Sequence, residues 1–186
     1  MIIGICGAAG AGKTTMAKYL VEQYNFTELS FATCLKDVVS IIFNWDRKLL
    51  EGDTPESRRW RETIDDWWSI RLGIPILTPR FILQYIGTDV MRGHFHPDIW
   101  ISHLERKLEP NKNYVITDCR FNNEINMLHK YNAYIIKVVK SNIKYYIHSS
   151  EELAHIIDDN IFDNYINNNG TKEQLYVEID KLLKLI

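Results

Sequence analysis

Apolar residues fall into two patterns that alternate near both ends of the chain. Short β-branched runs suit buried parallel strands at IIGIC (2–6), FTELSFA (26–32), NYVITD (113–118), AYIIKVV (133–139) and, more weakly, IFDNYI (161–166). Segments with helical spacing follow most of these runs, as in TTMAKYLVEQY (14–24). This alternation predicts an α/β fold in which helices flank a parallel sheet.

The middle of the chain, from about residue 34 to 110, has no convincing strand. Its patterns are helical in LKDVVSIIF (35–43), TPESRRWRETIDDWWSIRLG (54–73), PRFILQYIGTDVMRG (79–93) and DIWISHLERKL (98–108). Thr54 before Pro55 is a typical helix start, and Gly73 is a typical stop. We therefore expect an all-helical insertion after the second strand.

One of these segments, PRFILQYIGTDVMRG, combines an apolar run with a polar stripe. Every fourth position is polar, at Arg80, Gln84, Thr88 and Arg92. Residues with this spacing share one side of an α-helix. The apolar residues expected to pack inward are Phe81, Ile82, Tyr85, Ile86 and Val90. The stripe is either a solvated face or the wall of a binding site, and the pattern alone leaves both open.

Residues 7–14, GAAGAGKT, match the phosphate-binding loop G-x-x-x-x-G-K-[ST] and lie between a predicted strand and a predicted helix. Backbone N–H groups of such a loop surround phosphate oxygens, aided by the positive end of the helix. The residues expected to bind a nucleoside triphosphate are Gly7, Ala8, Ala9, Gly10, Ala11, Gly12, Lys13, Thr14 and Thr15. Lys13 would reach the β- and γ-phosphates, and the Thr14 hydroxyl would bind Mg²⁺.

Two alternatives to a triphosphate site fit these glycines less well. A glycine-rich turn without a ligand is uncommon between a strand and a helix of this kind. A dinucleotide fingerprint needs a third glycine where this chain has Thr15, and it gives Lys13 no role. The loop therefore favours a triphosphate site.

The stretch TDCRF places Asp118 and Arg120 at the end of a predicted strand. Ligands of open parallel sheets bind at this edge. A carboxylate there can hold Mg²⁺ through a water or orient an attacking oxygen, and an arginine can stabilise a transferring phosphoryl group. In the alternative, Asp118 caps the following helix and Arg120 is a surface residue. The two roles of Asp118 are compatible.

The segment KVVKSNIKYYIHSSEE (137–152) carries Lys137, Lys140 and Lys144 without a regular pattern. A mobile loop that brings positive charge over bound phosphates would have this composition. An ordinary solvated loop would have it too. The sequence favours neither.

Composition narrows the class of protein. A chain of 186 residues suits one compact domain, and its net charge of −2 argues against a partner such as a nucleic-acid backbone. Three widely spaced cysteines argue against disulfide scaffolds and zinc modules and fit a reducing compartment. The chain shows no signal peptide and no apolar stretch long enough to span a membrane. We expect a cytoplasmic protein.

Several stretches in this order resemble the deoxynucleoside monophosphate kinases of large DNA bacteriophages and similar viral enzymes. They are GAAGAGKT, FATCLKD, PRFILQYIGTDVMR, DIW, TDCRFNNE, HSSEE and NNNGTKEQL. Only the first is specific by itself, and the order and spacing of the others carry the resemblance, which extends from end to end of the chain.

The resemblance implies the fold of P-loop nucleoside monophosphate kinases. The core would comprise residues 1–33 and 111–186, with a helical monophosphate-binding insertion at about 34–110 and a short lid at about 139–150. The implied reaction transfers the γ-phosphoryl group of ATP to a (deoxy)nucleoside 5′-monophosphate with Mg²⁺, in nucleotide supply for DNA synthesis. The enzyme would be a monomer or homodimer, in the host cytoplasm if it is viral.

The resemblance also implies roles for particular residues. Lys13, Asp118 and Arg120 would be catalytic, with Thr14 and Asp118 at the metal. The acceptor monophosphate would be bound by Lys36, Arg80, Gln84, Thr88 and Arg92, the two uncharged side chains meeting the base edge. The backbone near residues 169–171 would lie by the adenine of ATP. Lys140 and Lys144 stand in the lid where many members have arginines, and lysine cannot make the bidentate contact of a guanidinium.

Two alternative functions remain open on these residues. Another small-molecule kinase of the same fold, such as a dephospho-coenzyme A kinase, also begins with a strand and a glycine-rich loop. A nucleotide-dependent switch or binding protein would be expected to carry a guanine-reading N-K-x-D stretch. The chain has none, and a helical insertion favours a kinase.

Overall fold

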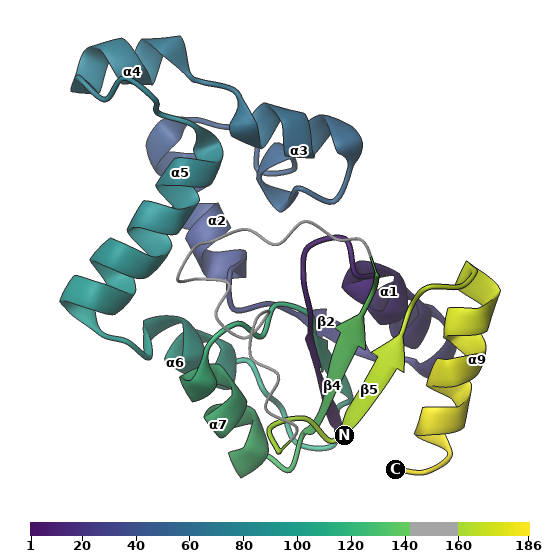
Figure 1. Ribbon diagram of the computed structural model, residues 1–186. Coiled ribbons are helices and arrows are strands. Elements are labelled where there is room, and N and C mark those ends of the chain that lie inside the picture. The colour runs from purple at the N-terminus through teal and green to yellow at the C-terminus, as the bar shows by residue number, and fades with distance from the viewer. Residues whose placement is uncertain (142–159) are drawn as a thin grey trace. The chain divides into compact units, whose positions relative to one another are not determined.

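The computed structural model describes residues 1–141 and 160–186 (Figure 1). These residues form two compact units. The core unit comprises Met1–Ser30 and Leu104–Ile186, and the helical unit comprises Phe31–His103. All strands of the described residues belong to the core unit, and the helical unit contains helices and loops only. The helical unit therefore falls within the part of the chain where the sequence predicts no strand, with a few residues more at its start.

The core unit contains a parallel five-stranded sheet with the order β2-β3-β1-β4-β5. The strands are β1 (Ile2–Cys6), β2 (Thr27–Leu29), β3 (Tyr114–Ile116), β4 (Tyr134–Val139) and β5 (Asn164–Asn167). Gly4 of β1 lies opposite Ile116 of β3 and Ile135 of β4, which fixes the register of the three central strands. The predicted parallel sheet is confirmed. Its second strand is shorter than the sequence predicts, and its fifth begins three residues later.

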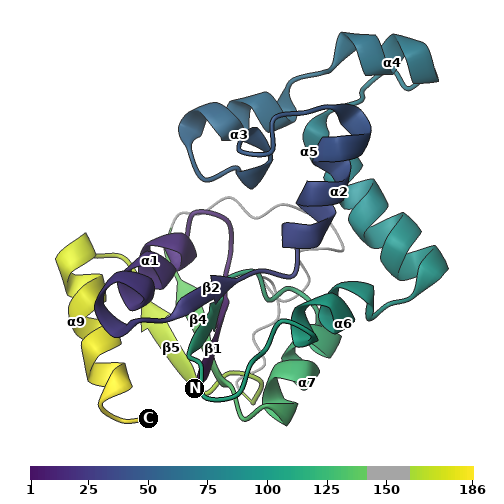
Figure 2. The ribbon, with the colours of Figure 1, turned by 180° about the vertical axis from the view of Figure 1, so that it is seen from behind.

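Helices cover both faces of the sheet (Figures 1 and 2). On one face, α1 (Lys13–Tyr24) and α9 (Lys172–Leu183) pack their apolar sides onto Ile3 and Ile5 in a single hydrophobic core. On the other face lies α7 (Asn122–Lys130). A Cβ added to Gly4 would come within 2.9 Å of Leu128 of α7. The glycine therefore lets α7 pack closely on the centre of the sheet.

The helical unit is built from short helices. They are α2 (Thr33–Phe43), the 3₁₀ turn η1 (Leu49–Glu51), α3 (Pro55–Glu62), α4 (Asp66–Leu72), α5 (Pro79–Gln84), the π-helix η2 (Tyr85–Phe95) and α6 (Ile99–Glu105), which continues into the core unit. Thr54 caps α3 as predicted, because its hydroxyl accepts a hydrogen bond from Ser57 N at 3.1 Å. Gly73 ends α4 in a left-handed conformation, with φ 67°. No helix among the described residues is long and apolar enough to cross a membrane.

The predicted inward face of residues 79–93 is wrong in part. Phe81 and Tyr85 are 39% and 47% exposed, and their rings stack on each other with centroids 5.8 Å apart. The buried residues of this segment are Pro79, Ile82 and Leu83 of α5 and Gly87 of η2. From Tyr85 onward the α-helical spacing no longer applies, since η2 is a π-helix that closes its hydrogen bonds at i→i+5 and places more residues in each turn than the 3.6 of an α-helix. Phe81 lies in α5, so the π-helix does not explain its exposure.

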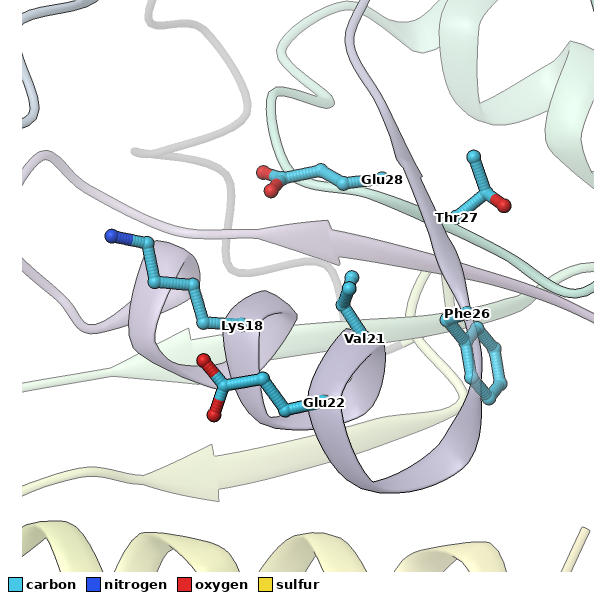
Figure 3. A pocket seen from close by; sticks show the side chains of 6 residues that line it. All are labelled: Lys18, Val21, Glu22, Phe26, Thr27 and Glu28. Carbon is cyan, nitrogen blue, oxygen red and sulfur yellow. The ribbon is translucent and has the colours of Figure 1, made fainter.

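A shallow depression of about 340 Å³ lies on the core unit between α1 and the start of β2 (Figure 3). Lys18 and Glu22 of α1 and Glu28 of β2 line it, with Val21 and Phe26 as its apolar part. Thr27, the first residue of β2, also lines it, so the depression includes the amino end of that strand. Ligands of parallel sheets bind at the opposite edge.

Candidate active site

The loop between β1 and α1 has the backbone of a phosphate-binding loop. Gly7, Gly10 and Gly12 have φ angles of 145°, 84° and 109°, which side chains other than hydrogen rarely allow. The Lys13 ammonium donates hydrogen bonds to the carbonyl oxygens of Gly7 at 2.6 Å and Ala8 at 2.9 Å. The charged group of the motif is therefore held against the loop itself.

The loop leads directly into the amino end of α1. Gly12 occupies the N-cap position of α1 and has no side chain with which to cap the helix. Helix N–H groups that no side chain caps, together with the helix dipole, favour an anion at this place. Thr14 is exposed in the first turn and Thr15 is partly buried. The geometry thus suits a chain of phosphates that ends near the Thr14 hydroxyl.

Asp118 lies two residues beyond β3, the strand next to β1. Its Oδ2 atom accepts a hydrogen bond of 2.7 Å from the Ser30 hydroxyl, which follows β2. Because β1, β3 and β2 are adjacent and parallel, their carboxyl ends bring the phosphate-binding loop, Asp118 and Ser30 to one edge of the sheet. Ser30 holds the carboxylate in one orientation.

Asp118 does not occupy the N-cap position of α7. The N-cap position of α7 is Phe121, three residues later. The buried Glu124 carboxylate accepts hydrogen bonds from the backbone N–H groups of Arg120 at 2.7 Å and Phe121 at 3.1 Å. Glu124 thereby caps α7, and it fixes the backbone from which the exposed Arg120 side chain extends.

The residue between the two candidates, Cys119, is buried. A hydrogen bond with Cys6 and burial raise the pKa of the Cys119 thiol well above its ordinary value. Both cysteines are free thiols. A buried thiol with a raised pKa carries little thiolate and is a poor nucleophile or metal ligand. We therefore interpret Cys6 and Cys119 as packing residues and not as catalytic ones.

Lys137 does not belong to the lid. It lies in β4, opposite Cys6 and Tyr165 of the neighbouring strands, and is 7% exposed. Its ammonium is 4.9 Å from the centre of the Phe162 ring, and burial lowers its pKa. The predicted strand at 133–139 already contained Lys137, and β4 confirms that Lys137 differs from Lys140, which follows the strand.

Part of the expected lid lies outside the described residues. Lys140 is exposed and directly follows β4. Lys144 falls within residues 142–159, which the structure does not describe. The lid at 139–150 and its lysines remain a prediction.

The sequence did not single out two residues of the core unit that contact candidate site residues. Ser30 hydrogen-bonds to Asp118, and the Asn168 side chain donates to the Ala11 carbonyl of the phosphate-binding loop at 2.8 Å. Ser30 could have been found, because it stands near the end of a predicted strand, as Asp118 does. Asn168 gives no such signal, since it is one of several asparagines in a row.

In the helical unit, two expected acceptor-binding cations are paired with carboxylates. Lys36 forms an ion pair with Glu51, which also accepts a hydrogen bond from Arg47. Arg80 forms an ion pair of 3.0 Å with Glu62. Burial alone would raise the pKa of Glu51, but Lys36 and Arg47 outweigh it, and the pKa lies below its ordinary value.

The four polar residues of the stripe are all partly buried: Arg80, Gln84, Thr88 and Arg92. Two of them, Thr88 and Arg92, lie in η2. The Trp100 indole N–H donates to the Gly87 carbonyl at 2.9 Å, and a Cβ added to Gly87 would come within 2.5 Å of Leu35. Packing on both sides of Gly87 thus holds the π-helix in place, and with it Thr88 and Arg92.

Residues 60–179 match the family described as deoxynucleotide monophosphate kinase. The chain belongs to this family. The match begins after the phosphate-binding loop, so the loop supports a kinase separately from it.

Two relatives of this chain agree with that result. A protein of Acanthamoeba polyphaga mimivirus with the provisional name deoxynucleotide monophosphate kinase is 33% identical over 96% of this chain and 94% of its own length. The deoxynucleoside-5′-monophosphate kinase of Escherichia phage T5 is 27% identical over 80% of this chain and 82% of its own length. The resemblance to viral and phage enzymes is confirmed, and the chain is a kinase, a phosphotransferase.

Solved kinase structures are similar at a lower level. Shikimate kinase from Acinetobacter baumannii is 11% identical, with a TM-score of 0.45 over 99% of this chain and 91% of that chain. Dephospho-CoA kinase from Campylobacter jejuni is 13% identical, with a TM-score of 0.44 over 98% of this chain and 95% of that chain. Similarity of this degree gives no information about the fold beyond the sheet topology described above.

Proposed function

We propose that this kinase transfers the γ-phosphoryl group of ATP, with Mg²⁺, to the 5′-phosphate of a (deoxy)nucleoside monophosphate. The product is the diphosphate, a precursor for DNA synthesis. The observation that carries the proposal is the phosphate-binding loop with Lys13 held against it, in a chain of this family. Phosphoryl transfer needs positioning and charge neutralisation from the protein and little covalent chemistry, which suits such a site.

The core unit would bind the donor. Backbone N–H groups of residues 7–15 would bind the phosphates of ATP, and Lys13 would neutralise charge on the β- and γ-phosphates. Arg120, exposed beside Asp118, would stabilise the negative charge of the transferring group. The backbone near residues 169–171 would lie by the adenine.

The oxygen atoms present fit Mg²⁺. The metal prefers oxygen ligands and is often held by one or two side chains together with substrate phosphates. Thr14 supplies an exposed hydroxyl, and Asp118 supplies a carboxylate that Ser30 orients through a 2.7 Å hydrogen bond. These two residues would hold the ion. When bound, Mg²⁺ neutralises charge on the phosphates.

The helical unit would bind the acceptor. Lys36 and Arg80, with Arg92 as a further candidate, would hold its phosphate, and Gln84 and Thr88 would contact the base edge. The ion pairs of Lys36 with Glu51 and of Arg80 with Glu62 keep both cations in defined positions. An acceptor phosphate would share or displace these carboxylates. The lid lysines, Lys140 and Lys144, would add positive charge.

The nature of the partner, the assembly and the location belong to the same proposal. The partner would be a small (deoxy)nucleoside monophosphate and not a nucleic acid, because the net charge is −2 and any bound phosphate would be held locally. The enzyme would act as a monomer or homodimer in the cytoplasm, which for a viral protein is that of the host.

A coupled assay of ATP consumption with a panel of monophosphates tests the proposal. The panel comprises the four deoxynucleoside monophosphates, their ribose counterparts and dephospho-coenzyme A. We expect turnover only when a nucleoside monophosphate is added. Equal turnover without an acceptor would support a nucleotide-dependent switch, and turnover only with dephospho-coenzyme A would support that kinase class. Either result would contradict the proposal.

A further inference from the structure

Asn168 is the first residue after β5, the outermost strand beside β4. Its backbone N–H donates to the carbonyl of Val139, the last residue of β4, at 2.8 Å. This bond continues the pairing in which Val139 lies opposite Asn167. The backbone of Asn168 is therefore fixed by the sheet, and its partly buried side chain starts from a rigid position.

That side chain reaches the phosphate-binding loop. The Asn168 Nδ2 atom donates to the Ala11 carbonyl at 2.8 Å, across 157 positions of sequence. A Cβ added to Gly12 would lie 2.2 Å from the same Nδ2 atom, too close for any side chain. The amide of Asn168 thus packs directly on the Ala11–Gly12 peptide, and Gly12 is required both by this contact and by its φ of 109°.

The contact with Asn168 sets the orientation of the Ala11–Gly12 peptide. A trans peptide is planar, and its C=O and N–H bonds point in opposite directions. Because Asn168 holds the Ala11 carbonyl, the Gly12 N–H is turned away from Asn168. Gly10 and Gly12 both have positive φ, and glycine permits many backbone conformations, so the loop sequence alone does not select this orientation. The hydrogen bond from Asn168 does.

We propose that Asn168 is a positioning residue of the kinase. Through the Ala11 carbonyl it orients the Gly12 N–H, one of the groups that bind the donor phosphates, without touching the nucleotide itself. This inference rests on the proposed function of the loop as the ATP site. It means that Asn168, which follows the edge strand β5, would contribute to the affinity for ATP although it lies outside the phosphate-binding motif.

The test compares Asn168→Ala and Asn168→Asp with Asn167→Ala and Asn167→Asp. Asn167 is exposed in β5 and adjacent in sequence, so Asn167→Asp adds the same charge without reaching Ala11. Aspartate at 168 keeps the shape of asparagine but presents only acceptors to a carbonyl. The measurements are the affinities for ATP and for inorganic tripolyphosphate by calorimetry, the KM values for ATP and acceptor, and the melting temperature without ligand.

We expect Asn168→Ala to weaken ATP and tripolyphosphate binding by roughly 3- to 10-fold, the range for one neutral hydrogen bond. Asn168→Asp should weaken both further, the KM for the acceptor should stay within about twofold of wild type, and both Asn167 variants should match wild type. Tripolyphosphate isolates the loop, because it has no base to bind elsewhere.

Three results would overturn the inference. The first is an unchanged affinity for tripolyphosphate in both Asn168 variants, and the second is a loss of affinity in Asn167→Asp equal to that in Asn168→Asp. The third is a lowered melting temperature of the Asn168 variants with no change in binding, which would indicate a merely structural role. If the wild-type protein showed no turnover that depends on a monophosphate, the proposed function would be overturned, and the positioning role that rests on it would be overturned too. Active wild type with normal phosphate binding by the Asn168 variants would overturn the positioning role alone.

Discussion

The core unit and the helical unit position the cations that we propose to bind phosphate in different ways. In the core unit, the Lys13 ammonium donates to backbone carbonyls of its own loop. In the helical unit, Lys36 and Arg80 pair with the carboxylates of Glu51 and Glu62. Carbonyls carry partial charges and carboxylates carry full ones. Lys13 is thus positioned by its own loop, whereas Lys36 and Arg80 are positioned by acidic side chains from other parts of the helical unit.

This difference has an energetic consequence. A triphosphate bound at the loop, as we propose, would meet the Lys13 ammonium at a position that two backbone carbonyls already define. A monophosphate that binds Arg80 competes with an ion pair, and partly exposed ion pairs contribute about 0–1 kcal/mol. We therefore expect donor-site substitutions to cost more than acceptor-site ones.

The largest effect is expected for Lys13→Ala. Loss of one preorganised group that stabilises the transition state lowers kcat by roughly 100-fold or more. The measurement is kcat for monophosphate-dependent ATP turnover. Lys18→Ala is the matched control, because Lys18 is an exposed lysine of the same helix beside the depression of Figure 3. If Lys13→Ala kept as much activity as Lys18→Ala, the assignment of the donor site to the loop would be wrong.

Arg80→Ala should have the next largest effect. Loss of a charge-assisted phosphate contact costs about 1.5–3 kcal/mol, or roughly one to two decades in kcat/KM for the acceptor. The KM for ATP should change little. Arg59→Ala, an exposed arginine of α3, serves as control. If acceptor kinetics of Arg80→Ala equal those of wild type, the assignment of the helical unit to the acceptor is wrong.

A smaller effect is expected where the helical unit depends on buried packing. Trp100→Phe removes the indole donor from the Gly87 carbonyl and should lower the free energy of unfolding by about 1–3 kcal/mol. It should also raise the KM for the acceptor, because Thr88 and Arg92 lie in the same π-helix. Urea unfolding and acceptor kinetics measure both.

The control is Trp67→Phe, since Trp67 is 63% exposed. Equal stability and acceptor KM in the two tryptophan variants would show that the bond to Gly87 does not support η2.

The smallest effect is expected for Glu51→Gln. The pKa of Glu51 is lowered from 4.5 in the folded protein, so its ion pairs add stability above pH 4.5 that is lost as pH falls through the folded pKa. Its side chain is 41% exposed, which limits the contribution at pH 7 to about 1 kcal/mol or less. Urea unfolding at pH 7 and pH 3 should therefore show a larger stability advantage of wild type over Glu51→Gln at pH 7 than at pH 3.

Glu22→Gln, on an exposed part of α1, is the control for this experiment. A difference between wild type and Glu51→Gln that is as large at pH 3 as at pH 7 would contradict the role of the ion pairs.

Local signals in the sequence account for most of the core unit. The strand runs, the loop GAAGAGKT and the position of Asp118 each depend on residues that are close in sequence, and the parallel sheet then brings their ends together. What the sequence could not show depends on distant contacts. Nothing near Asn168 indicates Ala11 as its partner, and Lys137 is buried only because strands pair on both of its sides.

The helical unit was harder to predict for a related reason. Its helix boundaries follow from local signals such as Thr54 and Gly73. The direction of side chains in residues 79–95 does not, because the change to a π-helix at Tyr85 depends on packing around Gly87. The polar stripe is partly buried, and Phe81 and Tyr85 are exposed against the expectation. That the stripe forms the wall of a binding site remains a prediction.

The central claim is that the chain moves the γ-phosphoryl group of ATP onto a nucleoside monophosphate. The most direct test incubates the protein with Mg²⁺, ATP labelled at the γ-phosphate and each deoxynucleoside monophosphate in turn, and separates the products. We predict that the label appears in a deoxynucleoside diphosphate, and that Lys13→Ala prevents this. Label found only in inorganic phosphate, or in no product with any monophosphate, would contradict the claim.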